Sequence, residues 1–333
     1  MLIFVLTDDF YESVAPDSVK FRPNVEKALL SDSEIITIAI CGELIGIDSE
    51  KAWFNFVRRN LRHLFPKMCD RTRFNRTRKN LLQVMKLIFV KISSYLKDEF
   101  LIADSFPLEV CKSERAHFCK AFKFEGAKYD YCASKKQTYF GYKVHALATV
   151  DGAVMIFEIT PANVDARNAL RDMTSDFTDF YSVFGDKVYV DKNLEQEFKL
   201  RGQRFFALKR DNAKNNLSDE ERQFILKYRK RIETVFAQLT NQFNIKRVLV
   251  KTFVGLSVRL LTKILAFNLC LLTNKIFNLN FSAVKSSNNL HDEDLQFPKN
   301  ILAFSFTSFF ADCSIFIRNF YETPVFVPPS ALD

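Results

Sequence analysis

The sequence predicts an α/β fold, in which a mixed five-stranded sheet with flanking helices follows a mainly helical segment. Apolar residues recur at helical spacing from about residue 23 to residue 96. From Glu99 the pattern changes to short apolar runs, and strands then alternate with helical segments up to about residue 277. This order is typical of α/β domains. With 333 residues and 48% hydrophobic content, the chain can bury a sizeable core, and two domains are expected.

The helical segment begins with a capping signal. Ser31 precedes Glu34 by three residues, and the apolar run Ile35 to Ile40 follows, which is the arrangement of a capping box. Farther along, a second set of apolar residues recurs at helical spacing and is expected to face the core: Trp53, Phe54, Val57, Leu61 and Leu64.

A dense basic stretch lies at residues 71–79, just before the apolar positions Leu81, Leu82, Met85 and Ile88. Between Lys51 and Lys97 there are 13 basic residues and one acid, Asp70. Such a face can bind phosphates and position a duplex without reading its sequence. We therefore predict a DNA-binding region there, the alternative being a solvated helix pair. The predicted contacts are Arg71, Arg73, Arg76, Arg78 and Lys79.

Five strands are predicted in the second part of the chain. The connection at residues 107–135 is read as a loop, and Asp151-Gly152 as a hairpin turn. A helix carrying Ala169, Leu170 and Met173 follows the third strand, and a short helix at residues 194–200 follows the fourth. The strands are expected at Phe100–Phe106, Thr138–Val150, Ala153–Ile159, Tyr181–Tyr189 and Arg204–Leu208.

A long helix is predicted to start at the Ser218-Asp-Glu-Glu221 cap and to run to about Leu239, with acids at its start that suit the helix dipole. Its buried stripe is expected to comprise Ile225, Ile232, Val235, Phe236 and Leu239, which places Glu233 at the edge of the core face. A last apolar helix, about Gly255 to Phe277, is expected to cover the sheet.

Asp104 lies inside an otherwise apolar strand, Phe-Leu-Ile-Ala-Asp-Ser-Phe. A buried carboxylate is costly unless a charged group meets it, so Asp104 either caps the end of the strand or holds a metal ion. Asp186 ends the fourth strand, and the long helix brings Glu233 to the same side of the sheet. The three carboxylates are therefore predicted to form one metal-binding and catalytic site.

Three carboxylates suit phosphodiester chemistry. Two Mg²⁺ ions can stabilise the attacking and leaving oxygens, and such ions prefer oxygen ligands while keeping several waters. The expected cofactor is therefore a pair of Mg²⁺ ions, with Mn²⁺ as a substitute. The net charge of +9 makes a polyanion the natural partner.

Composition also limits the compartment. Seven irregularly spaced cysteines without a Cys-x-x-Cys pair indicate neither a disulfide framework nor a zinc ribbon, and they fit a reducing cytosol. The N-terminus lacks the basic region of a signal peptide, and the apolar stretch Thr252 to Ile276 is interrupted by Arg259 and Lys263. We expect a soluble protein of the cytoplasm, associated with the nucleoid, and no membrane partner.

Several segments resemble DDE-type bacterial insertion-sequence transposases, and specifically the insertion-sequence family 982 type. The resemblance runs from about Thr7 to Phe277, with its motifs in the expected order. The matching segments are Leu30–Thr37, Phe65-Pro66, Arg73–Arg76, Ile102–Pro107, Ala133–Lys136, Tyr139–His145, Gly185–Tyr189 and Arg231–Phe236. The resemblance implies an RNase H-like catalytic domain with Asp104, Asp186 and Glu233 as the metal-binding triad. It also implies terminal inverted repeats and target DNA as partners, and a homodimer or larger assembly in the synaptic complex.

Three further residues are candidate DNA contacts. Lys143 and His145 alternate on one strand and share a face, which is either the active-site face or an ordinary polar face. Arg229 lies one helical turn before Glu233 and either pairs with it or touches phosphate. Asp191 is a rival to Asp186 but is expected to be a helix N-cap.

The predicted organisation has three parts: a helical DNA-binding domain at 1–97, the RNase H-like domain at 98–277, and an atypical tail at 278–333. The tail has three basic residues against six acids and is read as a private extension or as read-through into adjacent DNA. The function expected is end cleavage and joining of the 3′-OH to target DNA. The alternatives are a decayed transposase that only binds DNA and a host nuclease without strand transfer.

Overall fold

The computed structural model describes residues 1–277 except 176, 178 and 209–218. The predicted cap at Ser218 and the predicted tail lie outside these residues. Residues 23–96 are mainly helical, as predicted, and helix α1 adds a segment that the sequence pattern did not indicate. The helices of this part are α1 (Leu2–Val14), α2 (Asp17–Lys20), η1 (Val25–Lys27), α3 (Asp32–Ile45), α4 (Glu50–Asn60), α5 (Arg71–Asn80) and α6 (Leu82–Ser94).

The capping box at the start of α3 is confirmed. The Ser31 hydroxyl accepts the Glu34 N–H at 3.1 Å, and the Ser31 N–H donates to the Glu34 carboxylate at 2.7 Å. Both bonds satisfy backbone donors that the first helical turn leaves open. Asp70 caps α5 in the same manner, because its carboxylate accepts the Arg73 N–H at 3.0 Å.

Within the described residues the sheet has six strands rather than the predicted five, in the order β2-β3-β1-β5-β6 with β4 also paired to β3. The additional strand, β2, lies within the predicted loop 107–135. It pairs with the first part of β3, and β4 pairs with the second part. The strands are β1 (Phe100–Cys111), β2 (Lys128–Cys132), β3 (Gln137–Thr149), β4 (Val154–Pro161), β5 (Ser182–Gly185) and β6 (Arg204–Ala207).

Strand β1 continues five residues beyond its predicted end, through Pro107. Beyond Ala103 it has β3 on one side only, because its pairing with β5 covers residues 100–103. A proline without an N–H is tolerated there, as on an edge strand. Asp104 consequently lies in the middle of the strand rather than near its end.

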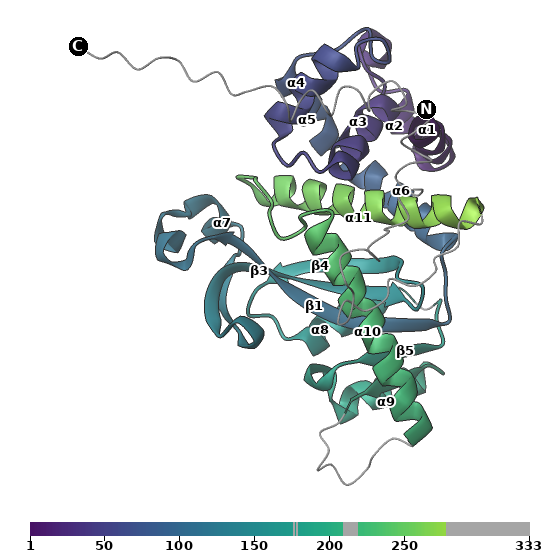
Figure 1. Cartoon of the computed structure of the whole chain (residues 1–333), viewed down its shortest axis with the longest axis vertical. Coiled ribbons are helices and arrows are strands. Elements are labelled where there is room, and N and C mark those ends of the chain that lie inside the picture. The colour runs from purple at the N-terminus through teal and green to yellow at the C-terminus, as the bar shows by residue number, and fades with distance from the viewer. Residues whose placement is uncertain (176, 178, 209–218, 278–333) are drawn as a thin grey trace, which may run out of the picture.

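The two faces of the sheet carry different helices (Figure 1). Ile102, Phe106 and Ala146 belong to the core shared with α10 (Asp219–Asn241) and α11 (Phe253–Ile276). Ala103 and Leu147 belong to the opposite core. That second core is formed with α8 (Ala166–Ser175), η4 (Lys187–Tyr189) and α9 (Lys192–Leu200). Since side chains alternate along a strand, Asp104 shares a face with Ile102 and Phe106.

Helix α11 was predicted to cover the sheet, and it lies between the sheet and the N-terminal helices (Figure 1). The Asn268 side chain accepts the Val154 N–H at 3.0 Å and donates to the Val154 carbonyl at 2.7 Å. These bonds satisfy backbone groups of β4. One continuous core spans α1 to α6, the sheet, α10 and α11, so packing does not stop at the predicted boundary after residue 97. By length and composition alone, α11 could cross a membrane, but 78% of its most apolar window is buried, as in a core helix.

Candidate active site

Asp104 and Asp186 are brought together by the parallel pairing of β1 with β5. The register ends with Ile102 opposite Phe184 and Ala103 opposite Gly185. The residue that follows each member of this last pair is an aspartate. The backbones of Asp104 and Asp186 are therefore adjacent, at the same level of the sheet. Neighbouring strands lie about 4.8 Å apart, which places both backbones within reach of one shared ion.

Glu233 comes to this point on α10. Ile232 and Phe236 of that helix are buried against the sheet, and the Phe106 and Phe236 rings meet at 5.0 Å, tilted by 73°. Val235 and Leu239 are also buried, as the predicted stripe requires. The side chain of Ile225 lies outside the described residues. The helix therefore packs along the face of β1 that carries Asp104.

The three acids line one small pocket of about 30 Å³. Its remaining walls are apolar side chains and backbone of β1, β5 and α10: Ile102, Ala103, Phe184, Gly185 and Ile232. The fold thus brings together three acids that are far apart in the chain. Asp104 and Asp186 are separated by 82 residues, and Asp186 and Glu233 by 47. The arrangement agrees with the sequence-based prediction of one shared site.

The two aspartates are oriented by their own backbone. Asp104 accepts the N–H of Ser105 at 2.7 Å, and Asp186 accepts the N–H of Lys187 at 2.6 Å. Strand β5 ends at Gly185, so Asp186 is not inside a strand extending to Tyr189, as was predicted, but caps the turn η4. Asp186 can cap η4 and still face the pocket, because one carboxylate oxygen accepts the Lys187 N–H and the other remains.

Tyr189 closes the site from the opposite core. A side chain at Gly185 would place its Cβ 2.9 Å from the Cβ of Tyr189, so only glycine allows this close approach beside Asp186. Burial raises the pKa of the Tyr189 phenol, and the nearby negative charge of Asp104 raises it further. The phenol therefore stays protonated. The sequence analysis assigned no role to Tyr189, although this residue ends the matching segment Gly185–Tyr189.

The donor set of the pocket is three carboxylates, which is the ligand chemistry of a hard divalent cation such as Mg²⁺ or Mn²⁺. In the part of the chain that the structure describes, however, no group of three His, Cys, Asp or Glu side chains forms a ready-made metal site. The type of donor and the shared pocket fit a cation.

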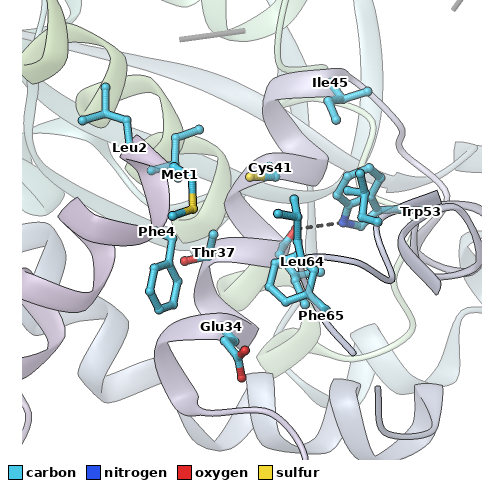
Figure 2. Close-up of a pocket in the computed structure, with 13 residues that line it drawn as sticks. Met1, Leu2, Phe4, Glu34, Thr37, Cys41, Ile45, Trp53, Leu64 and Phe65 are labelled. Carbon is cyan, nitrogen blue, oxygen red and sulfur yellow. Dashed lines mark hydrogen bonds between the residues drawn. The ribbon is translucent and has the colours of Figure 1, made fainter. Parts of the chain in front are cut away.

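A second and larger cavity, of about 200 Å³, lies among the N-terminal helices (Figure 2). It is mostly apolar and is lined by residues of α1, α3, α4 and the segment after α4. Trp53 forms one wall, and its indole N–H donates to the Ile38 carbonyl at 2.8 Å. The cavity shares no lining residue with the carboxylate pocket.

Most of the predicted basic contacts on α5 are at the surface. Arg71, Arg73, Arg76 and Lys79 are exposed. Arg78 corrects the prediction: it is only 5% exposed, pairs with Glu50 and lies over the Phe74 ring at 5.9 Å. The sequence contained the signal, because Arg78 is four residues after Phe74 and three before Leu81 and therefore belongs to the apolar stripe.

Lys143 and His145 share a face, as predicted, but it is the face opposite Asp104. In the β1–β3 register Ser105 is opposite His145, whereas Asp104 is opposite Ala146. His145 is fully buried, with Nε2 3.0 Å from the Thr160 hydroxyl. Lys143 pairs with Asp130 at 2.9 Å. The predicted DNA contact is therefore wrong for His145, because a fully buried ring cannot reach DNA, and the active-site-face reading is wrong for both residues.

The burial of His145 predicts a pH-dependent stability. Burial, followed by the charge of Lys143, lowers its pKa to about 4. The unfolded chain binds this proton near pH 6.5, so stability falls as pH drops from 6.5 towards 4, by about 2 kcal/mol at pH 5. His145→Leu should flatten the dependence of the urea midpoint on pH in this range. His63→Leu, at an exposed position, should keep the wild-type slope, and an unchanged slope in His145→Leu would contradict the assignment.

Two other predictions concern the surroundings of the triad. Asp191 is an N-cap, as expected: it accepts the Asn193 N–H at 2.9 Å and pairs with Arg171 at 2.7 Å. Arg229 lies in α10, but its side chain is outside the described residues. Lys246, which follows α10, was not singled out by the sequence, and it lies above the Phe106 ring next to the site.

The comparisons with known proteins agree with this geometry. Residues 96–249 match a family model described as the transposase DDE domain, and all three acids fall inside the matched region. One solved structure, a cryo-EM structure of a piggyBac transposase synaptic complex with hairpin DNA, is similar to 97% of this chain and 82% of its own, with a TM-score of 0.50 and 11% identity. The search of curated proteins found no match. The family match supports a DDE transposase over residues 96–249, and the structural likeness supports an overall fold shared with that piggyBac transposase.

Proposed function

We propose that this chain is a DNA transposase of the insertion-sequence family 982 type, which binds terminal inverted repeats and moves its element by cleavage and joining. The observation that carries the proposal is the single pocket lined by Asp104, Asp186 and Glu233 within the region that matches the DDE domain. Three carboxylates, from β1, the residue after β5 and α10, have no evident structural purpose in one pocket, because like charges repel each other.

The proposed reaction has two steps, a hydrolysis followed by a transesterification. In the first, water attacks the phosphorus at the element end, the bond to the 3′ oxygen breaks, and a 3′-OH and a 5′-phosphate result. In the second, that 3′-OH attacks a phosphodiester of the target, forms a new phosphorus–oxygen bond and releases a target 3′-OH. The joining step breaks one phosphodiester bond and forms another. It therefore needs no external energy source and no covalent protein–DNA bond.

The contribution of the chain is to position the carboxylates. The neighbouring β1 residues Ile102, Ala103 and Phe106 are buried, which holds the backbone that carries Asp104 in place beside β5. Two Mg²⁺ ions, when bound, would activate the attacking oxygen and stabilise the leaving oxygen. Asp104, Asp186 and Glu233 would hold them, and Mn²⁺ would serve in their place. Tyr189 fills the space behind the aspartates and excludes water from that side.

DNA is the proposed partner on two further grounds. The structurally similar piggyBac transposase was solved with DNA. Helix α5 presents four exposed cations, Arg71, Arg73, Arg76 and Lys79, which suit phosphate contacts. We propose that residues 1–97 supply DNA binding, that two or more copies hold paired ends in the synaptic complex, and that the protein works in the cytoplasm at the nucleoid.

The test uses the full-length protein, labelled duplexes tiled from the DNA that flanks its gene, Mg²⁺ or Mn²⁺, and a supercoiled plasmid. We expect one labelled end to become covalently joined to the plasmid, and a chelator to abolish joining. Binding of an end without cleavage would instead favour a decayed transposase. Cleavage without joining would favour a nuclease with the same fold.

A further inference from the structure

The segment from Ser113 to Lys136, here called the hairpin arm, projects from the side of the sheet (Figure 1). It comprises η2 (Ser113–Phe118), α7 (Lys120–Phe124), β2 and η3 (Ala133–Lys135). Its surface is unusual in exposing large aromatic rings: Phe124 is 94% exposed, Tyr129 is 52% exposed and Tyr131 is 58% exposed. Exposed aromatic rings on a soluble domain mark a surface that contacts something else.

The hairpin arm is also basic. It contains six Lys and Arg residues and three acids. Two of the acids are already engaged within the fold, because Glu125 accepts the Phe253 N–H at 2.7 Å and Asp130 pairs with Lys143 at 2.9 Å. The cations of the arm therefore face solvent with little local compensation, and the natural occupant of this surface is an anion.

The register places the two tyrosines on the active-site face. Tyr129 is opposite Phe140 and Tyr131 is opposite Thr138 in the β2–β3 ladder, and the Tyr129 and Phe140 rings meet at 4.9 Å. Phe140 and Ala146 lie on the same face of β3, since they are six residues apart, and Ala146 is opposite Asp104. Tyr129 and Tyr131 therefore share the sheet face of the carboxylate pocket.

Lys135 ends η3 in the connection between β2 and β3, and Lys246 lies beside the carboxylate pocket. Lys246 lies over the Phe106 ring at 5.7 Å, and this ring is held by Phe236, one helical turn after Glu233. Burial and then the charge of Lys135 lower the pKa of Lys246, while the negative charge of Asp104 acts in the opposite direction. Lys246 is thus within electrostatic reach of both Lys135 and Asp104.

Among the described residues, no ion pair includes Lys135 or Lys246, so both cations can bind an anion. A nucleic-acid strand supplies both missing components, namely phosphates for the lysines and bases with flat faces for the tyrosines. A second copy of the arm would bring the same positive charge and would be repelled.

We propose that the hairpin arm is a clamp for a DNA strand whose bases are unpaired near the cleavage point. Lys135 and Lys246 hold phosphates of the strand entering the carboxylate pocket, and Tyr129 and Tyr131 stack on its bases. This proposal rests on the proposed function, because it takes the carboxylate pocket as the place where DNA is cut.

The experiment measures binding of the full-length chain to a short duplex that carries a single-stranded oligothymidine tail, in Ca²⁺, by fluorescence anisotropy over a range of salt. We expect Lys135→Ala with Lys246→Ala to reduce the slope of log K against log salt by about 1.4–1.8, since two phosphate contacts are lost. The matched control is Lys192→Ala with Lys199→Ala, which removes the same charge from the opposite face and should keep the wild-type slope.

The tyrosines are tested by the preference for the tailed duplex over a blunt one. Tyr129→Ser with Tyr131→Ser should weaken binding of the tailed duplex by about fivefold or more, because stacking is lost. Tyr129→Phe with Tyr131→Phe keeps the rings and should bind as the wild type does. All four positions are at least partly exposed, so thermal melting of the variants should match that of the wild type.

Three results would overturn the clamp. If the arm variants bind DNA with the affinity and the salt dependence of the wild type, and the wild type joins DNA, the clamp is wrong and the proposed function stands. If the Tyr→Ser variants change the sedimentation coefficient of the free protein and leave DNA binding unchanged, the arm is a contact between copies. If the wild type neither binds nor joins DNA, the proposed function fails, and the clamp fails with it.

Discussion

Glu233→Gln is expected to lower end cleavage and joining by about 1,000-fold or more while leaving DNA binding nearly unchanged. The change keeps the size and shape of the side chain and removes only its charge. An ion held by this carboxylate contributes several kcal/mol of charge stabilisation in the transition state, and about 1.4 kcal/mol corresponds to a factor of ten in rate. The same result is expected for Asp104→Asn and Asp186→Asn, because all three acids line one pocket.

The measurement is the plasmid-joining assay, with end binding followed separately by anisotropy. Glu26→Gln is the matched control, since it makes the same change at an exposed position on η1, which does not line the carboxylate pocket. Wild-type joining by Glu233→Gln would remove this residue from the active site. Loss of binding together with joining would indicate that the helix had moved rather than that a ligand had been lost.

Glu43→Gln is expected to destabilise the fold by about 3–5 kcal/mol, because it leaves two buried cations with an incomplete partner. Glu43 is only 3% exposed, and its carboxylate lies 2.7 Å from Arg259 Nε and 2.7 Å from Lys263 Nζ. Lys263 also donates to the Phe243 carbonyl at 2.5 Å. The cluster thus ties α3 to α11 and to the end of the segment that carries Glu233.

Urea denaturation of the full-length protein measures this effect. Glu12→Gln breaks an ion pair with Lys20 in which the glutamate is 61% exposed, and it should change stability very little. Equal midpoints for Glu43→Gln and the wild type would mean that the buried cluster is not a structural link. Since α11 packs against both halves of the molecule, loss of this link should also lower strand joining.

Much of the candidate site followed from local pattern. The apolar run around Asp104, the strand before Asp186 and the stripe of Ile232, Val235 and Phe236 each predicted an element that the structure contains. Their order along the chain then predicted that three acids would meet. This succeeded because strands and amphipathic helices carry their burial pattern in the spacing of apolar residues.

Strand β2 could not be predicted in the same way. Its sequence, Lys-Tyr-Asp-Tyr-Cys, is short and has two charged residues among five, and it is a strand because it pairs with residues 137–141 of β3. Edge strands are commonly polar and short, which protects them from pairing with other chains. Their sequences therefore resemble loops.

The sequence by itself determined which residues share a face of one element. It placed Lys143 and His145 on one face of a strand, and Glu233 next to the buried stripe of a helix. What only the tertiary structure decided is which face meets which partner. A period of two residues is the same for both faces of a strand, so the sequence could not place His145 in the core opposite Asp104. Nor could it place Lys246 over the Phe106 ring, because that contact depends on how two segments separated by more than 100 residues fold onto one sheet.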